Sequence, residues 1–585
     1  MRSGSLNLRT VIVIPWVSGL SITANASFDK AFQFHKKFET PWYLYTWDGN
    51  AEHKVTKGKR GLDAPQLSED MADGQTITIN AYASYEKTFA EKHNFKVMAG
   101  TERRNGMRDV FNAFRKNYIS SAVDQLFAGA SDQYMSNSGS ASQSAILSYF
   151  GRVNYDLSKK YLIEFVWRYD GSYKFPTTKQ FGFFPGVSAG WRVSEEAFWK
   201  ENVSLINDLK IRGSWGQTGN DRIDEYQYLA TYGYIDNRTY VFGSTDSKLL
   251  NETKIPNPNV TWEVANQSNI GFDALLLNSK LSISADYFNN IRSQILIKRN
   301  ASIPSSTGLT LPPENIGKVQ NRGVEATIGY NGKSGDFQYD VSVNGSYSKN
   351  KIVFWDETPG IPVYQQSTGR PMGSALYYQA IGIFKDAAAV AAYPHWAGAQ
   401  PGDVIFEDVG GPDGVPDGKI DGLDRVMNEK NNFPRFVGGL TINLRFKQFD
   451  LSMLFQGSLG AVQYVSPESG EIGNYYKLYA DNRWTPENTN TAFPRTWNRD
   501  EEYWRSQGNT FWLQNMNYAR LKNFELGYNL PSSVNKSLGI EGLRLYVNGS
   551  NLLTMSKQKL IDPEVEGGTS YAPQRVITGG LTLTF

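Results

Sequence analysis

The chain has 585 residues and a formal net charge of +2, with 60 Lys and Arg against 58 Asp and Glu. A charge balance this even creates no strong electrostatic field that would attract a polyanion. We therefore expect no nucleic-acid partner. The chain contains no cysteine, which excludes disulfides, thiolate zinc sites and cysteine nucleophiles.

No stretch of the chain is apolar enough to predict a transmembrane helix, which needs about 20 consecutive apolar residues. The longest apolar-rich run is Val11–Val17. Mean hydropathy is −0.45, although the chain holds 33 Tyr, 32 Phe and 14 Trp. A membrane-spanning β-strand needs only one apolar face, so this composition remains compatible with a β-barrel.

The amino end carries two competing signals. Arg2 and Arg9, the apolar run 11–17 and the small residues 24–26 imitate a signal peptide with its cleavage site. Alternation across Gly19–Phe28 indicates a β-strand instead. We favour the strand, because the same alternation continues downstream.

Strict alternation of apolar and polar residues recurs along the chain. In Leu281–Tyr287 the odd positions are apolar and the even ones are Ser, Ser and Asp. Successive strand side chains point to opposite faces, so such a segment has one apolar and one polar face. We predict roughly eighteen strands of this kind. Further examples are Val341–Tyr347, Ile442–Phe446, Phe449–Met453, Leu543–Asn548 and Leu581–Phe585.

The predicted connections alternate between short and long. Short turns are expected at Asn278–Lys280, Asn331–Gly332 and Lys447–Gln448. Short turns at one end and long loops at the other are typical of an outer-membrane barrel. The long polar stretches are 220–260, 291–320, 351–434 and 462–516.

The alternative fold is a soluble array of β-sandwiches or a propeller, whose strands also alternate. Two features favour the membrane barrel. No fixed repeat period is present, and aromatic residues such as Tyr287, Phe288 and Tyr528 stand near strand ends, where a membrane interface favours them. We therefore predict an all-β fold, a large antiparallel transmembrane barrel with long extracellular loops.

One acidic segment predicts a calcium loop. Asp413, Asp417, Asp421 and Asp424 occupy positions 1, 5, 9 and 12 of a twelve-residue stretch with Gly418 at position 6. Oxygen ligands on a tight glycine turn suit calcium. However, Val415 stands at position 3, and position 12 is Asp rather than Glu. The alternative is a solvated Asp-Gly turn, so calcium is the one cofactor that the sequence suggests.

Aromatic residues in the last long loop are candidates for gripping a substrate, since loops at the mouth of a transporter meet their ligands. Each of them can equally pack the loop against itself. No phosphate-binding motif and no distinctive acid/base pair occurs, so we expect no enzyme. The aromatic candidates are Trp484, Trp497, Tyr503, Trp504 and Trp512.

Ordered segments from about Pro41 to Phe585 resemble the SusC/RagA group of TonB-linked outer-membrane proteins. No single segment is decisive, and their order along most of the chain carries the resemblance. The segments are 41–45, 147–155, 169–172, 184–192, 209–220, 315–325, 520–523, 543–546, 551–552 and 562–564.

The resemblance implies a plugged barrel of about 22 strands in the outer membrane of a Gram-negative bacterium. It also implies import of glycan oligomers or peptides, a SusD-like surface lipoprotein as a lid, and energy from a TonB-type protein. Substrate-binding residues are not implied. The terminal Leu581, Leu583 and Phe585 are similar to a barrel-assembly signal.

Where the family has a signal peptide, a small β domain, a TonB-contacting segment and a plug, the sequence begins with the barrel. We therefore interpret residues 1–585 as one N-terminally truncated barrel of roughly 18 strands, with no plug domain. TonB would be contacted through the missing part. Two alternatives remain: an ungated porin-like or structural barrel, and a soluble β-rich carbohydrate-binding protein.

Overall fold

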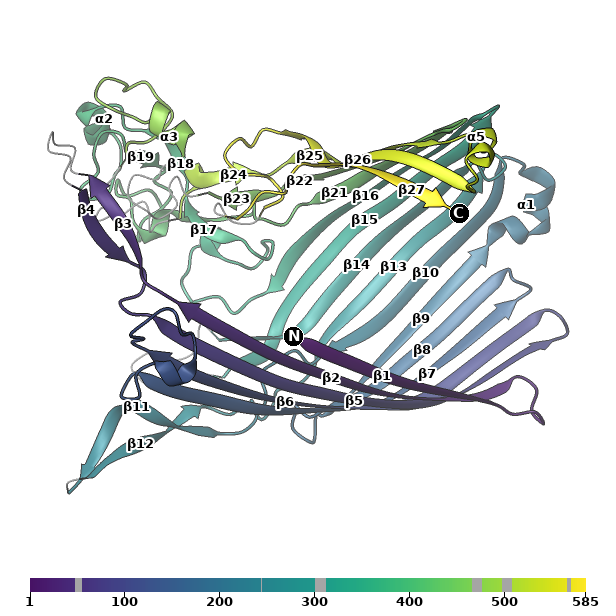
Figure 1. The fold of residues 1–585 in the computed structure, drawn as a ribbon, viewed down its shortest axis with the longest axis horizontal. Coiled ribbons are helices and arrows are strands. Elements are labelled where there is room, and N and C mark those ends of the chain that lie inside the picture. The colour runs from purple at the N-terminus through teal and green to yellow at the C-terminus, as the bar shows by residue number, and fades with distance from the viewer. Residues whose placement is uncertain (48–54, 244, 300–311, 466–475, 497–507, 566–569) are drawn as a thin grey trace. The chain divides into compact units, whose positions relative to one another are not determined.

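The computed structural model describes residues 1–47, 55–243, 245–299, 312–465, 476–496, 508–565 and 570–585. The fold is all-β, as predicted, and 17 strands belong to one principal antiparallel sheet (Figure 1). The chain divides into two units, which are described separately.

The first unit comprises residues 1–158, 163–187 and 221–228. Its strands form an antiparallel meander in which each one pairs with the next. The two longest have 24 residues each, whereas about 9–11 residues cross a bilayer, so they extend beyond it. The strands are β1 (Arg2–Val13), β2 (Leu20–Glu39), β5 (Gln66–Phe89), β6 (His93–Lys116) and β7 (Met135–Leu157), with the hairpin β3 (Trp42–Trp47) and β4 (Val55–Arg60) inserted after β2.

The second unit comprises residues 159–162, 188–220 and 229–585. Ten of its strands form another antiparallel meander, again with each strand paired to the next. Two strands, β8 (Tyr161–Ser172) and β9 (Phe181–Arg192), contain residues of both units. The ten are β10 (Ile206–Asn220), β13 (Glu263–Leu276), β14 (Leu281–Ile297), β15 (Glu314–Ser334), β16 (Phe337–Phe354), β21 (Phe436–Phe446), β22 (Phe449–Leu459), β25 (Tyr518–Asn529), β26 (Gly542–Ser556) and β27 (Val576–Thr584).

The long connections contain small elements of their own. Four short helices are described: α1 (Ala197–Asn202), α2 (Ala387–Ala392), α3 (Lys477–Asn482) and α5 (Ser532–Ser537). Within the described parts of the chain, no helix has the length and apolarity needed to span a bilayer. The paired short strands are β11 (Thr231–Phe242) with β12 (Thr245–Lys254), β17 (Ala375–Tyr378) with β20 (Arg425–Asn428), β18 (Ala380–Ile383) with β19 (Val404–Phe406), and β23 (Val462–Tyr464) with β24 (Leu513–Asn515).

Two of the three predicted short turns are confirmed. Lys447–Gln448 joins β21 to β22, and residues 277–280 join β13 to β14. The turn predicted at Asn331–Gly332 is wrong, because Asn331 pairs with Asp340 inside the β15–β16 ladder. The chain reverses three residues later at Gly335, whose φ of 57° is the left-handed conformation that glycine adopts without strain.

The strand interpretation of the amino end is confirmed. Residues 19–28 fall almost entirely in β2, and the segment that imitates a signal peptide forms β1, the turn after it and the first residues of β2. Ile12 pairs with Ile22 and Leu8 with Ala26, so the apolar residues of the two strands share one face.

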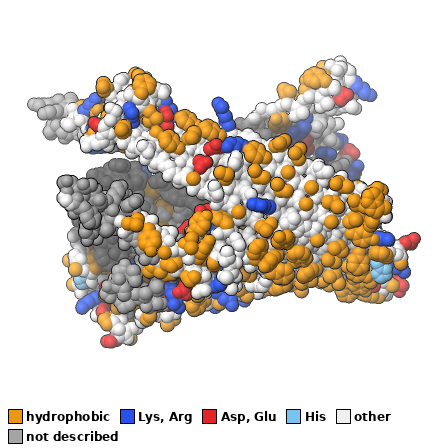
Figure 2. Space-filling view, turned by 90° about the horizontal axis from the view of Figure 1, so that it is seen from below, with side chains coloured by type: hydrophobic (Ala, Val, Ile, Leu, Met, Phe, Trp, Pro, Cys, Tyr) orange, Lys and Arg blue, Asp and Glu red, His pale blue; other side chains and the backbone are white. Residues whose placement is uncertain are grey.

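The sheet of the second unit has an apolar face and a polar face. On the apolar face Ile270, Ile328 and Val343 are 60, 47 and 49% exposed. Figure 2, a view from below the orientation of Figure 1, shows exposed hydrophobic side chains gathered on the side that it draws. Large apolar side chains are left exposed in such numbers where lipid rather than water covers them, so the apolar face is the membrane face of the barrel fold.

Candidate functional site: the polar face and the folded loops

One arginine ties three strands together on the polar face. Arg212 of β10 donates from Nε to Asp273 of β13 at 3.0 Å, and from Nη2 to Asp286 of β14 at 2.7 Å. Ser284 adds a 2.8 Å hydrogen bond to Asp273. The guanidinium crosses β13 above Gly271, where a Cβ would collide with the Asp286 carboxylate. The glycine therefore makes room for the ion pair.

A second arginine, eight strands further along the sheet, also ties three strands together. Arg544 of β26 donates from Nε to Asp450 of β22 at 3.2 Å, and from Nη2 to Glu525 of β25 at 2.7 Å. It passes over Gly527, where a Cβ would collide with Arg544 and Asp450. Charged groups aligned over two glycines give this face a fixed polar surface, suited to line an aqueous path through a barrel.

A third ionic cluster fastens the connection between β26 and β27. Arg520 of β25 is 1% exposed and donates to Asp562 and Glu564. Lys522 and the Tyr518 hydroxyl each donate to Glu564 at about 3.0 Å. A buried guanidinium between two carboxylates keeps its charges compensated, which a buried ion requires. The cluster thus anchors residues 562–564 to the sheet.

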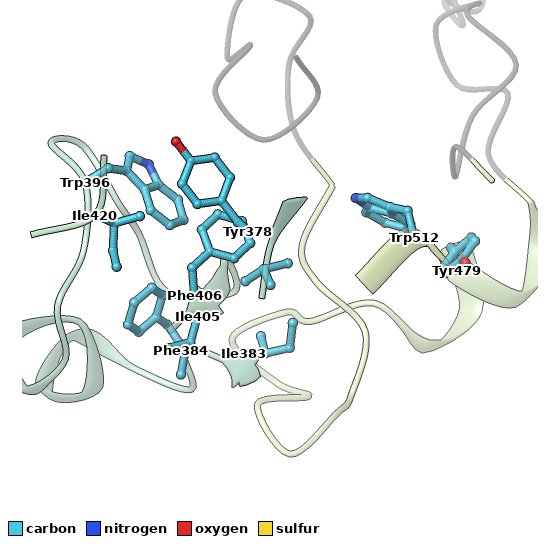
Figure 3. Close-up of a cluster of buried hydrophobic side chains, with 10 residues drawn as sticks. Tyr378, Ile383, Phe384, Trp396, Ile405, Phe406, Ile420, Tyr479 and Trp512 are labelled. Carbon is cyan, nitrogen blue, oxygen red and sulfur yellow. The ribbon is translucent and has the colours of Figure 1, made fainter. Parts of the chain in front are cut away.

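A hydrophobic core lies in the long loops rather than in the sheet (Figure 3). We call it the loop core. Tyr378 and Phe406 stack with ring centroids 5.0 Å apart, and Tyr479 meets Trp512 edge to face at 5.3 Å. Each of these contacts lies within one of two long connections, and residues of both connections belong to the same buried cluster. The loop core consists of Tyr378, Ile383, Phe384, Trp396, Val404, Ile405, Phe406, Ile420, Tyr479 and Trp512.

Polar bonds join the same two connections. Asp403 is 2% exposed and accepts a 2.7 Å hydrogen bond from Nε of Arg495. The backbone N–H of Tyr378 donates to Gly508, and that of Ala380 donates to the Thr510 hydroxyl. The loops are therefore a preformed surface, which lowers the entropy lost when a partner binds.

The aromatic candidates of the last loop divide into two groups. Trp512 is 2% exposed within the loop core. Trp484 packs against that core and donates from Nε1 to the Lys385 carbonyl at 3.1 Å. Trp512 therefore packs the loop against itself, which is the alternative that the sequence left open, and Trp484 packs it against the preceding long connection. Trp497, Tyr503 and Trp504 lie outside the described residues.

The acidic loop directs its carboxylates at its own backbone. Asp424 is 1% exposed; its Oδ1 accepts from the amides of Val409 and Gly410, and its Oδ2 accepts from Asp421. Burial raises the pKa of Asp424. Asp421 in turn caps Leu423. These bonds make the segment a capped turn.

The fit of this loop to calcium follows from those bonds. Asp408, just upstream of the loop, accepts from the amides of Asp417 and Gly418. Across the described residues, no group of three or more His, Asp or Glu side chains is arranged to hold a metal ion. As arranged, Asp413, Asp417, Asp421 and Asp424 do not form a ligand set. Calcium binding stays a prediction from the sequence.

Several of the charged residues described above carried no signal in the sequence. Arg212, Arg520 and Arg544 stand among polar residues of alternating strands, and only the strand pairing brings their partners near. Arg495 and Asp403 are separated by 92 positions. A polar-face arginine with a glycine on the neighbouring strand is a pattern that could have identified Arg212 and Arg544.

Known proteins share this architecture. The family model described as TonB dependent receptor-like, beta-barrel matches residues 15–552. TonB-dependent receptor P3 of Formosa agariphila is 30% identical over 506 residues, covering 84% of this chain and 49% of the relative. TonB-dependent receptor SusC of Bacteroides thetaiotaomicron is 27% identical over 525 residues, covering 87% and 50%. The chain thus spans about half the length of these curated relatives.

Among solved structures, the RagAB peptide importer in its open-open state matches with a TM-score of 0.80 and 23% identity. That match covers 100% of this chain and 61% of the other. At this level of identity the match establishes the fold, and it agrees with the amphipathic sheet and the long loops described above.

Proposed function

The chain belongs to the family of TonB dependent receptor-like β-barrels, and from that membership we propose that the protein imports glycan oligomers or peptides through the outer membrane. Relatives in this family are outer-membrane receptors of Gram-negative bacteria and not enzymes, and both statements apply to this chain. A soluble carbohydrate-binding protein is therefore excluded.

The observation that carries the proposal is the polarity of the sheet in the second unit. Its apolar face exposes Ile270 and Val343, while the opposite face bears the Arg212 and Arg544 ion-pair clusters. Charges aligned along one face are expensive to bury unless they line water. A hydrated path for polar solutes is the use that this arrangement supports best.

We propose two partners for the protein. A SusD-like lipoprotein would meet the loop core and the segments around it, which are already folded. A TonB-type protein would supply the energy for import. A solved peptide importer shares the fold, which supports peptides as cargo without separating them from glycans.

Uptake by whole cells tests the proposal. Cells with and without the gene receive labelled oligosaccharides or labelled oligopeptides, with and without a protonophore. We expect gene-dependent uptake of one class that the protonophore abolishes. Gene-dependent uptake that the protonophore does not reduce would favour the ungated, porin-like barrel instead. The absence of gene-dependent uptake for both classes would refute import.

Co-purification tests the lipoprotein partner. We expect a SusD-like lipoprotein to accompany the tagged protein from outer membranes. A Trp512→Ala variant, whose loop core is disrupted, should lose this partner while remaining in the membrane. A Gly579→Ala variant is the matched control, because an added Cβ there meets nothing within 4 Å. Retention of the lipoprotein by both variants would show that the lipoprotein does not bind through the loop core.

A further inference from the structure

Two basic residues face each other on neighbouring strands of the second unit. Arg322 of β15 stands directly opposite Lys349 of β16 in the antiparallel register, and both side chains are exposed. Lys351 pairs with Gln320 one step further along and is diagonal to Arg322. Directly opposed side chains have Cβ atoms about 4.5–5.5 Å apart, and like charges at that spacing repel.

These three residues lie on the membrane face. The register is regular from Val319 to Ser334, so Arg322 has the same orientation as Val324 and Ile328. Lys349 likewise shares its face with Tyr347, and Val324 and Tyr347 are opposite one another at 51 and 46% exposure. The basic cluster therefore begins immediately beyond an apolar row.

The cluster also lies at the long-loop end of its strands. The β15–β16 turn at Gly335 is at the opposite end of the ladder, where the register closes at Ser334 and Phe337. In an outer-membrane barrel the short turns are periplasmic, so the cluster belongs to the outer-leaflet side. Long basic side chains there extend their charged ends to the lipid headgroups.

Within the described residues the cluster has no direct ion pair, although the charge of Lys349 acts on the Glu429 carboxylate. The side chains of Arg322, Lys349 and Lys351 form no ion pair and no hydrogen bond with another described residue. The Glu429 carboxylate, which Lys349 influences, is already bonded to Arg370 at 2.7 Å. By contrast, the outward-facing Lys30 of the first unit is paired with Asp73.

We propose that Arg322, Lys349 and Lys351 bind the phosphate-bearing headgroup of an outer-leaflet lipid. A phosphate would relieve the repulsion between the opposed charges, and the guanidinium of Arg322 can donate two parallel hydrogen bonds to it. The acyl chains would lie along the apolar row that begins at Val324 and Tyr347. Phosphate charge and an adjoining apolar surface together select a lipid over a soluble anion.

Lipid retention measured by native mass spectrometry tests this proposal. The full chain is purified in neutral detergent micelles doped with bisphosphorylated lipid A or with phosphatidylcholine. We expect retained lipid A and no retained phosphatidylcholine. Substitution of Arg322, Lys349 and Lys351 by Gln should weaken retention about fivefold for each charge removed. Lys30→Gln, which removes a lysine that is already paired, should behave as wild type.

Two further measurements keep the outcome decisive. Arg322→Glu should form a cross-strand ion pair with Lys349, raise the thermal stability in lipid-free micelles and reduce lipid A retention. This variant tests the site even if the triple variant does not fold. Equal retention by the wild-type and Arg322→Glu proteins would overturn the proposal. So would displacement of lipid A by millimolar inorganic phosphate, which would indicate a general anion site.

Discussion

Nη2 of Arg520 lies 2.7 and 2.6 Å from the two carboxylate oxygens of Asp562, although the residues are 42 positions apart. The segments 520–523 and 562–564 each contributed separately to the family resemblance. The structure shows that they contact each other, so they form one structural feature. Its role is to fasten the β26–β27 connection to β25.

Replacement of Arg520 by Met should destabilise this connection strongly. The change leaves Asp562 and Glu564 near one another with Lys522 as their remaining cation. Removing one partner of a buried ion pair costs about 3–5 kcal/mol. Hydrogen exchange of residues 557–565 in the folded protein measures the loss.

The matched control is Asp562→Asn, which preserves the shape of the side chain and leaves the Arg520–Glu564 pair intact. We expect a smaller increase in exchange. If the two variants lost protection equally, the ion pairs would not be the source of the anchoring.

Alternation predicted the strands well, because a period of two follows directly from strand geometry. Leu281–Tyr287 and Val341–Tyr347 both lie in strands whose apolar residues share the membrane face. The turn at Asn331–Gly332 was misplaced by three residues, since its sequence suits a turn but the pairing of Asn331 with Asp340 extends the ladder. At this position the pairing register of the two strands, rather than the local turn propensity, decides where the chain reverses.

The loop core could not be predicted from the sequence, for a different reason. Phe406 and Trp512 belong to the same core, but more than one hundred positions and a complete hairpin of the sheet separate them. Nothing in a polar loop sequence identifies such a partner. The ionic clusters share this limit, because Arg212 meets Asp286 only through the order of three strands.

Gly527→Ala should destabilise the Arg544 cluster. The added Cβ collides with Arg544 and Asp450, so the ion pair must separate or the strands must shift. Overpacking of this kind costs about 1–3 kcal/mol. The free energy of unfolding in detergent, from denaturant titration, measures the effect. Gly579→Ala is the control and should change stability far less, since its Cβ meets open space.

Trp512→Ala should unfold the loops without unfolding the sheet. Removing a buried Trp side chain costs about 3–5 kcal/mol, and Trp512 contacts both Tyr479 and Phe511. We expect rapid protease cleavage within the two long connections, 355–435 and 460–517, and an unchanged melting temperature of the sheet. Tyr479→Phe retains the ring and should resist the protease as wild type does. Simultaneous loss of both structures would contradict an independent loop core.

Asp424→Asn should loosen the acidic loop. Asp424 now accepts hydrogen bonds from the backbone N–H groups of Val409, Gly410 and Asp421. In the variant, the side-chain NH2 of the new Asn would face at least one of these N–H donors. An unsatisfied buried donor costs about 1–3 kcal/mol, so these three amides should exchange faster. A calcium titration followed on the same amides tests the calcium prediction. Ligation by Asp424 would have to release them, and unchanged exchange would count against it.

Acid should loosen the segment before β21 through Glu429. The hydrogen bond from Arg370, and then the charges of Lys349, Arg370 and Arg435, lower the pKa of Glu429. A carboxylate with a lowered folded pKa stabilises the structure above its ordinary pKa and loses that contribution as pH falls through the folded value. Protection of residues 425–435 should therefore hold from neutral pH down to about 4.5, the ordinary pKa of a Glu side chain, and fall at lower pH.

Glu429→Gln separates this effect from the titration of other carboxylates. The variant should show lower protection at neutral pH and a flatter dependence, because no charge remains to be lost. Arg370→Gln should also flatten the profile, since it removes the principal cause of the lowered pKa. A profile as steep in both variants as in the wild type would assign the acid sensitivity to another group. The difference between wild type and Glu429→Gln is thus the quantity that isolates the Arg370–Glu429 pair.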